Sequence, residues 1–311
     1  MPDSDPVLAL RDLASWSFAG VSLAVFGHPI RHSVSPPMHN AALAELARTE
    51  PRFKDWKYFR FEIPLDDLAH ALEFAHARKF RGINLTVPHK RLAFSWVAAV
   101  DPEARPIGAV NTLSWTEKGW QGANTDGYGL ATALRETLGR ELAGAAVILL
   151  GAGGAARGAA LECLRRRCAA LWIANRTREH RDALLADLEP LAEGVPLRGF
   201  DPAAPPADLP AGGVVVNATS AGLHAGDAAP IDLAALPRPA AVFDMIYNPA
   251  ETPLLARAAA LGLPCANGLS MLAHQGAKSL EIWSGIPAAR TAATMLEAAG
   301  AALRGRDGRV A

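Results

Sequence analysis

"VILLGAGGAARG" occupies residues 147–158 and places an apolar run directly before a glycine turn and a helix-forming segment. This order of strand, turn and helix is the context that a dinucleotide fingerprint requires. Gly151 permits the tight turn, Gly153 lets backbone N–H groups approach a pyrophosphate, and the small Ala156 lets the helix pack on its strand. The start of that helix carries partial positive charge, which favours an anion. The stretch therefore predicts a Rossmann-like nucleotide-binding domain.

The next strand separates this interpretation from a plain tight turn without a ligand. "LWIANRTREHR" at 171–181 places Asn175, Arg176 and Thr177 where an NAD-selective site carries Asp or Glu to bind the ribose 2′-hydroxyl. Arginine can pair with a phosphate bidentately and stack on adenine, and Asn and Thr add neutral hydrogen bonds. The pattern predicts NADP rather than NAD. The alternative is that these arginines belong to a solvated helix start.

Composition excludes some partners. The 311 residues suit two domains better than one, and half of them are apolar, which supplies buried cores. The 31 basic and 31 acidic side chains cancel. Without net charge the chain has no global field that draws it to nucleic acid or to an anionic membrane. We expect neither as a partner, and any anion is expected to bind locally.

The chain carries no sign of export or of a metal site. "MPDSDPVLAL" at 1–10 has acidic residues where a signal peptide has positive charge, and no apolar run approaches the ~20 residues of a membrane span. Cys163, Cys168 and Cys265 form no CxxC pair, and the histidines lack HExxH spacing and partner cysteines. We expect a cytoplasmic protein with reduced thiols and no metal.

Short apolar runs alternate with longer segments rich in Ala, Leu, Glu and Arg, which predicts mostly parallel α/β sheets. "DPAAPPADLPAGG" at 201–213 is expected to be a surface connection, and 267–285 has the apolar spacing of an amphipathic helix. The predicted strands are 21–27, 58–63, 82–87, 146–151, 171–175, 213–219 and 241–246.

Candidate ligand-binding side chains lie upstream of the glycine turn. In "HSVSPPMHN" at 32–40, Ser33 and Ser35 are two residues apart, and in an extended backbone both hydroxyls would face one acceptor, such as a carboxylate. A turn or a helix cap also explains the pair.

"GINLTVPHK" at 82–90 places Asn84, Thr86 and Lys90 at a strand end and in the loop after it, where α/β folds build their sites. Only six of the 31 basic residues are lysine, so the chain uses arginine for ordinary surface cations. A lysine at this place therefore indicates chemistry, because lysine can exchange a proton and arginine cannot.

Two further motifs carry polar groups. "AVNTL" supplies Asn111, and "GANTDGYG" supplies Asn124, Thr125 and Asp126 among glycines. An aspartate beside a lysine can orient it and set its proton affinity. A turn or N-cap role explains Asp126 equally well.

Taken in order, these motifs resemble those of the shikimate dehydrogenases over roughly residues 21–285. The motifs are "VFGHPIRHSVSPPMHN", "GINLTVPHK", "GAVNTL", "NTDGYG", "LLGAGGAARG", "ANRTR", "VNATSAG", "FDMIYNPAETPLL" and "NGLSMLAHQGAKSLEIW". The resemblance implies reversible, NADPH-dependent reduction of 3-dehydroshikimate, a small-molecule substrate, to shikimate in aromatic amino-acid biosynthesis. It implies a monomer or homodimer.

The resemblance also implies roles for single residues. Lys90 matches the acid/base and Asp126 its partner, which also orients a ring hydroxyl. Ser33 and Ser35, aided by Thr86 and Tyr247, match the substrate carboxylate site, and Asn84, Asn111 and Gln275 match the groups on the ring hydroxyls. The matching cofactor residues are Gly151, Ala152, Gly153, Gly154, Ala155 and Ala156 at the pyrophosphate, Asn175, Arg176 and Thr177 at the 2′-phosphate, and Ala218, Thr219, Ser220, Met245 and Gly268 along the nicotinamide.

The implied architecture has two α/β domains with a cleft between them that opens and closes. Residues 1–125 plus 268–311 would form a discontinuous substrate domain, and 126–267 a Rossmann-like NADP domain. One departure concerns the 2′-phosphate. Some relatives use a second arginine where His180 stands here, with Arg178 and Arg181 nearby, and the sequence leaves open which of these assists Arg176.

Two alternatives remain. A quinate/shikimate dehydrogenase of the same fold accepts a ring with an added C1 hydroxyl and often uses NAD. The missing acid after the second nucleotide strand counts against it, as does Ser35, where some quinate-active relatives carry Thr. A non-catalytic paralogue that senses a ligand would be expected to lose Lys90 or Asp126, and both are present.

Overall fold

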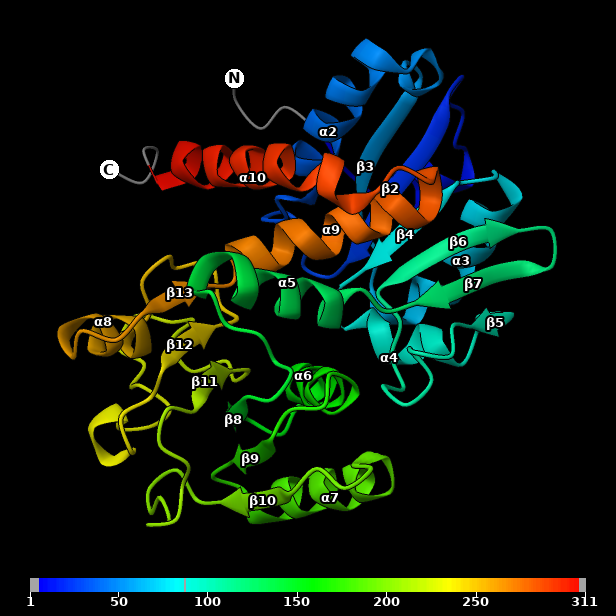
Figure 1. Ribbon diagram of the computed structural model, residues 1–311. Coiled ribbons are helices and arrows are strands. Elements are labelled where there is room, and N and C mark those ends of the chain that lie inside the picture. The colour runs from blue at the N-terminus through cyan, green and yellow to red at the C-terminus, as the bar shows by residue number, and fades with distance from the viewer. Residues whose placement is uncertain (1–5, 87, 308–311) are drawn as a thin grey trace. The chain divides into compact units, whose positions relative to one another are not determined.

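The computed structural model describes residues 6–86 and 88–307 (Figure 1). Contacts divide the chain into unit 1, formed by Met1–Thr125 with Ala273–Ala311, and unit 2, formed by Asp126–Leu272. The sequence places the return to the first unit at residue 268, whereas the units separate within helix α9 (Leu269–Ser284). The first turn of α9 packs in unit 2, since Met271 belongs to the core there.

Unit 1 contains a mixed seven-stranded sheet with the order β1-β3-β2-β4-β6-β7-β5. Strands β1, β3, β2 and β4 are parallel, whereas β6 and β7 form an antiparallel hairpin that continues the sheet beyond β4. The strands are β1 (Val7–Leu8), β2 (Val21–Gly27), β3 (Trp56–Glu62), β4 (Gly82–Leu85), β5 (Ala99–Val100), β6 (Thr112–Thr116) and β7 (Gly119–Ala123).

Helices cover both faces of this sheet. Ala24 and Phe26 of β2 pack with α1 (Leu10–Ala14), α3 (Leu68–Ala77) and α4 (His89–Phe94) in one core. α2 (Ser35–Thr49) packs against β3 and against α10 (Ala292–Asp307). α9 reaches the sheet through Trp283, whose indole N–H donates to the carbonyl of Leu113 at 3.0 Å. Short 3₁₀ turns lie at η1 (Pro51–Phe53), η2 (Leu65–Asp67) and η5 (Ala288–Arg290).

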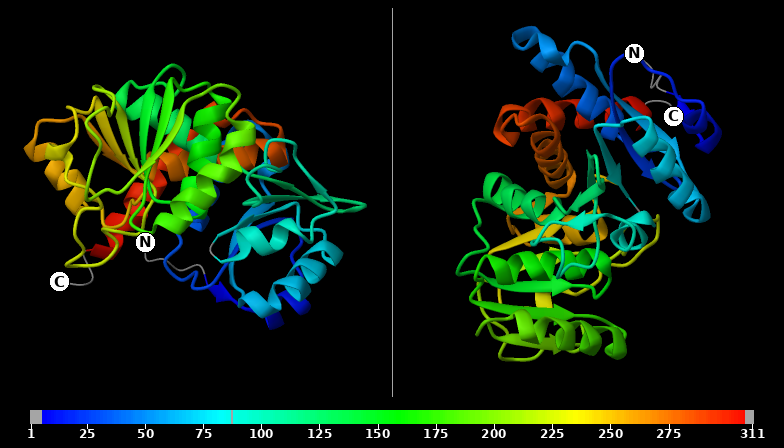
Figure 2. Two further views of the ribbon diagram at one scale, coloured as in Figure 1. Left: turned by 90° about the horizontal axis from the view of Figure 1, so that it is seen from below. Right: turned by 90° about the vertical axis from the view of Figure 1, so that its right-hand side faces the viewer.

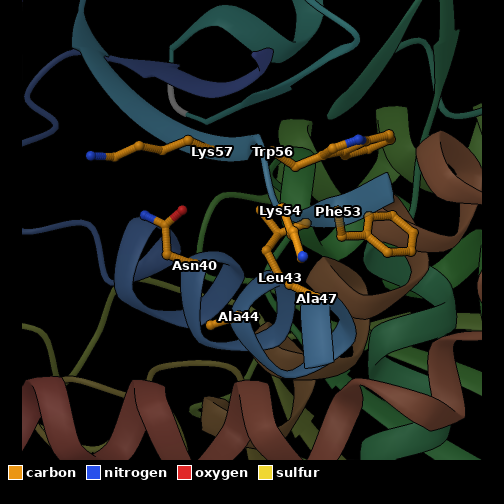
Figure 3. A pocket seen from close by; sticks show the side chains of 8 residues that line it. All are labelled: Asn40, Leu43, Ala44, Ala47, Phe53, Lys54, Trp56 and Lys57. Atoms are coloured by element: carbon orange, nitrogen blue, oxygen red, sulfur yellow. The ribbon is translucent and has the colours of Figure 1, made fainter. Parts of the chain in front are cut away.

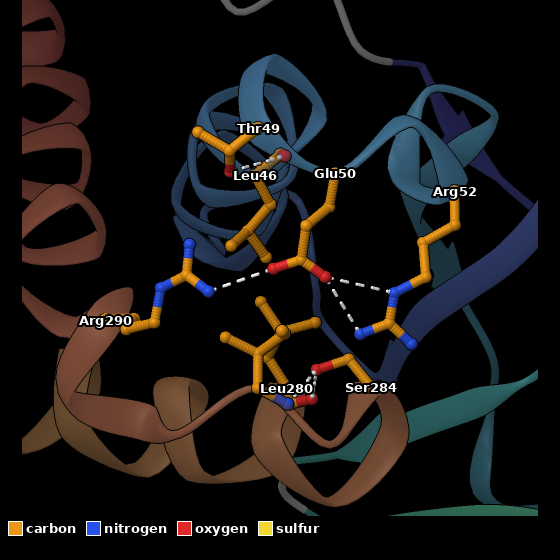
Figure 4. A network of polar contacts seen from close by, with 8 residues as sticks. Leu46, Thr49, Glu50, Arg52, Leu280, Ser284 and Arg290 are labelled. Atoms are coloured by element: carbon orange, nitrogen blue, oxygen red, sulfur yellow. Dashed lines mark hydrogen bonds and ion pairs between the residues drawn. The ribbon is translucent and has the colours of Figure 1, made fainter.

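A charged cluster attaches the returning segment to α2 (Figure 4). The Glu50 carboxylate accepts hydrogen bonds from Arg52 at 3.1 and 3.2 Å and from Arg290, at the end of η5, at 2.9 Å. About half of each guanidinium side chain is exposed, so such pairs stabilise the fold by no more than ~1 kcal/mol. The burial of Trp283 therefore contributes more than these ion pairs to the stability of the contact between the returning segment and the rest of unit 1.

Unit 2 is a doubly wound fold with six parallel strands in the order β10-β9-β8-β11-β12-β13, the Rossmann arrangement (Figure 2). Side chains of β8 alternate between two cores: Val147 and Leu149 face α5, α6 and α7, and Ile148 and Leu150 face α8. This double burial explains the unbroken apolar run. The elements are α5 (Asp126–Leu138), β8 (Ala146–Leu150), α6 (Gly154–Arg165), β9 (Ala170–Ala174), α7 (Arg178–Leu188), η3 (Glu189–Leu191), β10 (Leu197–Phe200), β11 (Val214–Asn217), η4 (Leu233–Ala235), β12 (Ala241–Asp244), α8 (Pro253–Ala260) and β13 (Cys265–Asn267).

The predicted fold class is confirmed. Each of the seven predicted strands is present, 21–27 with the predicted bounds and the other six with shorter or shifted ends. Among the described residues, no helix is both long enough and apolar enough to cross a membrane.

His39 of α2 gives unit 1 a dependence on pH. The ring is fully buried and stacks on Tyr58 with centroids 4.1 Å apart, and among the described residues neither ring nitrogen has a hydrogen-bond partner. Burial lowers the pKa of His39 from 6.5 to about 3. Between these values the unfolded chain binds a proton that the folded chain does not bind, so stability falls as the pH drops below 6.5.

We expect His39→Phe to lose less stability than the parent between pH 7.5 and pH 5. At pH 5 the parent should have lost about 2 kcal/mol through this histidine, and phenylalanine cannot titrate. Urea unfolding of both proteins at the two pH values measures the difference. An equal loss in parent and variant would show that His39 does not couple folding to pH.

Candidate active site

The predicted site residues of unit 1 gather where its parallel strands end. β2 and β4 pair in register near their ends, at Phe26 with Leu85. Ser33 lies in the loop after β2 and Ser35 begins the helix that follows, whereas Thr86 follows β4 and Lys90 lies in the next helix. The Thr86 N–H donates to the carbonyl of Phe26 at 3.1 Å and ties the two loops together. This edge is where α/β sheets place ligands.

Ser33 and Ser35 are neighbours at the start of α2, but not through an extended backbone. Val34 between them has φ −94° and ψ 3°, which is a turn. The Ser33 hydroxyl oxygen accepts a hydrogen bond from the N–H of Ser35 at 3.3 Å. Of the two explanations that the sequence leaves open for the pair, the extended backbone is absent and the turn at a helix start is present. Their role in binding a carboxylate stays a prediction.

Asn84, Asn111 and Gln275 come from three segments and share one hydrogen-bond network. The Asn84 amide donates to the carbonyl of Asn111 at 3.1 Å, and the Asn111 amide donates to the side-chain oxygen of Gln275 at 3.4 Å. Asn84 is 7% exposed and Asn111 is 1% exposed. Buried amides held by several bonds have fixed orientations, as selective recognition of hydroxyl groups requires.

Tyr58 joins this network without having been predicted. Its hydroxyl donates to the side-chain oxygen of Asn84 at 2.8 Å. Burial raises the pKa of Tyr58 well above its ordinary value, which keeps the hydroxyl protonated. The neighbouring Ser35 side chain acts to lower the pKa of Tyr58. Tyr58 is thus a member of the amide network that lies next to Ser35.

Three small hydroxyl side chains complete the network. Ser279 accepts from the Asn84 amide at 3.0 Å, and the hydroxyl of Thr112 donates to the side-chain oxygen of Asn111 at 2.8 Å. The N–H of Thr125 donates to the same oxygen at 2.9 Å. The three are almost fully buried, so they support the amides rather than face solvent.

A backbone hydrogen bond ties Lys90 to the Asn111 segment, and Asp126 begins the helix after it. Lys90 lies in the first turn of α4, and its carbonyl accepts from the N–H of Val110 at 2.9 Å. Asp126 is the first residue of α5 and directly follows Thr125 in the chain. Tyr247, the remaining predicted carboxylate ligand, belongs to unit 2 and follows β12.

A pocket of about 360 Å³ lies elsewhere on unit 1 (Figure 3). Its lining includes Phe53, Lys54, Trp56 and Lys57 at the beginning of β3, whereas the predicted site residues follow the ends of β2 and β4. It therefore plays no part in the candidate active site.

The glycine turn of unit 2 fits a pyrophosphate. Gly151 has φ +111°, and a Cβ there would lie 3.1 Å from the carbonyl oxygen of Ala218, so only glycine suits this turn. A Cβ on Gly153 or Gly154 would meet no atom within 4 Å, which leaves open space above the loop. α6 has no side-chain cap and no acid in its first turn, so its free N–H groups and dipole favour an anion. Buried Ala156 packs the helix on the sheet.

The cations after β9 differ in their partners. Arg178 and Arg181 both bind Asp182, at 3.2 and 2.9 Å, and the hydrogen bond from Arg181 lowers the pKa of that carboxyl. Arg176 is exposed, and within 6–86 and 88–307 it forms no hydrogen bond or ion pair. Asn175 donates to the carbonyl of Thr177 at 2.8 Å, which shapes the turn. Arg176 is thus the cation in this turn that can take a phosphate without breaking an existing pair.

The predicted nicotinamide residues surround the ends of β11 and β12. Ala218, Thr219 and Ser220 follow β11, and Met245 follows β12. A Cβ on Gly268 would lie 2.1 Å from the Met245 carbonyl oxygen, so the close approach of these two segments requires glycine.

A buried carboxylate holds these segments in place. Asp244 accepts hydrogen bonds from the Thr252 hydroxyl at 2.7 Å, from the Asn217 amide at 3.0 Å and from the N–H of Ile246 at 3.0 Å. Asn217 in turn accepts from Thr219. Burial raises the pKa of Asp244, and its three donors partly oppose that shift.

Asp244→Ala should lower the free energy of unfolding by about 2–5 kcal/mol, because it leaves buried donors without an acceptor at ~1–3 kcal/mol each. Asp232→Ala is the matched control: Asp232 is exposed and accepts from the N–H of Ala234, so its loss should cost ~1 kcal/mol or less. Urea denaturation measures both. Similar losses in the two variants would contradict a special role for the buried network.

The histidines and cysteines of the described residues form no cluster suited to a metal ion. Across the described part of the chain, no group of three or more His, Cys, Asp and Glu side chains is arranged to hold a metal ion. His28 and His32 are four residues apart, but they lie in the irregular segment after β2 rather than on a helix face. Cys163, Cys168 and Cys265 are free thiols.

The Rossmann strand order, the glycine turn and the polar network define a two-unit α/β protein of the dinucleotide-dependent dehydrogenase class. The family profile for the shikimate dehydrogenase substrate binding domain matches residues 25–113, and that for the shikimate 5′-dehydrogenase C-terminal domain matches residues 268–299. The shikimate dehydrogenase (NADP(+)) of Geobacter sp. strain M21 is 41% identical over 266 residues, which are 84% of this chain and 89% of that protein. This chain therefore belongs to the shikimate dehydrogenase family.

Solved structures share the fold. The shikimate 5-dehydrogenase from Thermus thermophilus, in complex with NADP(H) and shikimate, is 36% identical with a TM-score of 0.77, over 91% of this chain and 99% of that one. The 5-ketofructose reductase of Gluconobacter sp. strain CHM43 is 31% identical with a TM-score of 0.78, over 90% of this chain and 99% of that one. The fold alone therefore does not determine which carbonyl compound is the substrate.

Proposed function

We propose that this protein catalyses the reversible, NADP-dependent interconversion of 3-dehydroshikimate and shikimate. The observation that carries the proposal is the 41% identity to a shikimate dehydrogenase (NADP(+)) over 84% of the chain. The buried amide network of Asn84, Asn111 and Gln275 supports it, because a polyhydroxylated ring needs several fixed hydrogen-bonding groups.

We assign acid/base catalysis to Lys90 and Asp126. Bound NADPH supplies a hydride to the C3 carbonyl carbon. As the C–O double bond becomes a single bond, the Lys90 ammonium gives a proton to the oxygen, and in the oxidation the neutral amine takes it back. Asp126 orients the Lys90 ammonium and a ring hydroxyl. The hydrogen bond from the N–H of Val110 to the Lys90 carbonyl, which places Lys90 beside the Asn111 segment, supports the assignment of Lys90.

Substrate binding is assigned mainly to unit 1. Ser33, Ser35, Thr86 and Tyr247 hold the carboxylate, and the amide network holds the ring hydroxyls. The assignment of unit 1 as the substrate unit agrees with the family profile for the substrate binding domain at residues 25–113.

NADP binding is assigned to unit 2. The pyrophosphate lies over residues 151–156, where the open space above Gly153 and Gly154 suits it. The 2′-phosphate pairs with Arg176, beside Asn175 and Thr177, since Arg178 and Arg181 already bind Asp182. The nicotinamide lies along the remaining residues, which are Ala218, Thr219, Ser220, Met245 and Gly268.

Initial rates of oxidation test the proposal, with shikimate and quinate each combined with NADP and NAD. Formation of the reduced nicotinamide is followed by its absorbance. Activity largely confined to shikimate with NADP supports the assignment. Comparable activity with quinate or NAD would move the protein to the broader quinate/shikimate branch, and no activity with either ring would contradict the proposal.

A further inference from the structure

One buried cation of unit 1 has no place in the assignments above. Arg60 lies in the middle of β3 and is 2% exposed, which makes it one of the largest fully buried side chains in the described part of the chain. Arginine keeps its charge under all ordinary conditions, and burial of a charge is costly unless hydrogen bonds compensate. A buried guanidinium therefore calls for a function at the place that it contacts.

Arg60 contacts the loop that carries the serine pair. Its Nη1 donates to the carbonyl of Arg31 at 2.8 Å and to the carbonyl of Ser33 at 3.3 Å. Both carbonyls thus point inward to the guanidinium. Because the C=O and N–H of a trans peptide point in opposite directions, the two N–H groups that follow point away from Arg60. The guanidinium fixes the course of the loop immediately before α2.

The start of α2 offers an anion few amide donors. Pro36 and Pro37 occupy the first turn and have no N–H, and the N–H of Ser35 is bonded to the Ser33 hydroxyl oxygen. A helix start normally attracts an anion through these N–H groups. At this helix start the groups that an anion can contact are the serine hydroxyls. The buried charge of Arg60 behind them supplies positive potential in a low-dielectric surrounding.

We propose that Arg60 is a positioning and charge-selecting residue for the substrate carboxylate. It holds the Ser33–Ser35 loop in place, and its charge makes the loop prefer an ionised carboxylate to a neutral group of the same shape. This inference rests on the proposed function in one respect, namely that the serine pair receives the carboxylate of the substrate.

The test compares shikimate with its methyl ester, which differs in charge but keeps the ring. Calorimetric titration gives the dissociation constants of both compounds for the parent, Arg60→Met and Arg60→Lys. We expect the parent to prefer the acid by ~10-fold or more and Arg60→Met to lose about 10- to 100-fold in affinity for the acid. The preference for acid over ester should largely disappear in Arg60→Met and largely survive in Arg60→Lys. Loop distortion affects both compounds and cancels in this ratio.

Arg31→Met is the matched control. It removes a guanidinium from the same loop, but from an exposed side chain, so the acid/ester preference should change by less than about threefold because water screens exposed charges. The kcat of Arg60→Met should also stay within about tenfold of the parent, since a positioning residue acts mainly on substrate affinity.

Three results would overturn the inference. They are a parent that binds acid and ester equally, an unchanged preference in Arg60→Met, and an Arg31→Met variant that loses the preference as Arg60→Met does. The first needs no variant, so it decides the matter even if Arg60→Met does not fold. Failure of the proposed function is distinct, because it appears as absent turnover of shikimate by the parent.

Discussion

Lys90→Ala is expected to lower kcat for shikimate oxidation by about 10²–10⁴-fold while KM for shikimate changes far less. The reason is that a positioned acid/base group stabilises the transition state, in which the proton moves, rather than the bound substrate. Steady-state kinetics at saturating NADP measures both constants. Lys90→Arg should be nearly as slow as the alanine variant, because it keeps the positive charge but cannot release a proton at neutral pH.

Lys118→Ala is the control for Lys90. Lys118 is one of the six lysines of the chain and lies exposed in the turn between β6 and β7. Its variant should keep kcat within about twofold of the parent. A kcat within a few-fold of the parent in Lys90→Ala would remove Lys90 from the catalytic role.

Arg176→Ala is expected to raise KM for NADP by about 10- to 100-fold and to leave KM for NAD nearly unchanged. The guanidinium meets only the 2′-phosphate, and a charge-assisted pair of this kind contributes ~1.5–3 kcal/mol. Kinetics with both cofactors at saturating shikimate gives the comparison. NAD serves as an internal control, because it lacks the group that Arg176 binds.

Arg178→Ala tests whether the effect on KM for NADP is specific to Arg176 or shared by the neighbouring arginines. Arg178 is bound to Asp182 in the first turn of α7, so its loss should raise KM for NADP by no more than about threefold. Equal losses with NADP and NAD in Arg176→Ala, or a larger effect at Arg178, would show that Arg176 does not select the cofactor.

Much of the fold follows from the sequence because buried parallel strands leave an unambiguous apolar signal. Residues 146–151 and 213–219 are apolar on both faces, and the structure buries both faces of β8 and β11. The β6–β7 hairpin gives no such signal, because Thr112–Thr116 and Gly119–Ala123 mix small, polar and aromatic residues. The two-residue strands β1 and β5 are too short for any periodicity.

The residues of the candidate site also include some that the sequence indicates and some that it does not. Motifs indicated the residues whose chemistry is visible in sequence, such as Lys90 and Arg176. The supporting groups were missed because their meaning depends on long-range contacts. Tyr58 stands in a strand of mixed aromatic and charged residues, and only its bond to Asn84 reveals its place in the network. For Ser279 a signal did exist, since it lies one helical turn after Gln275 and on the same side of α9.

Local backbone geometry decides between the two explanations of the serine pair. The spacing of Ser33 and Ser35 is compatible with an extended strand and with a helix start. The two prolines that follow favour the second, because proline is accepted in the first turn of a helix. Val34 accordingly adopts turn dihedrals.

The division of α9 between the units has a consequence for the order in which the units fold during synthesis. Unit 2 is continuous in the chain, so all of it is synthesised before residues 273–311, which complete unit 1. Until Trp283 reaches Leu113, one face of the first sheet lacks its cover, and the amides around Asn84 lack Ser279. Domains usually mature from the N-terminus onward during translation. Here the later-made nucleotide unit can complete its core first, and the nascent N-terminal sheet stays in need of protection from aggregation until the final helices emerge.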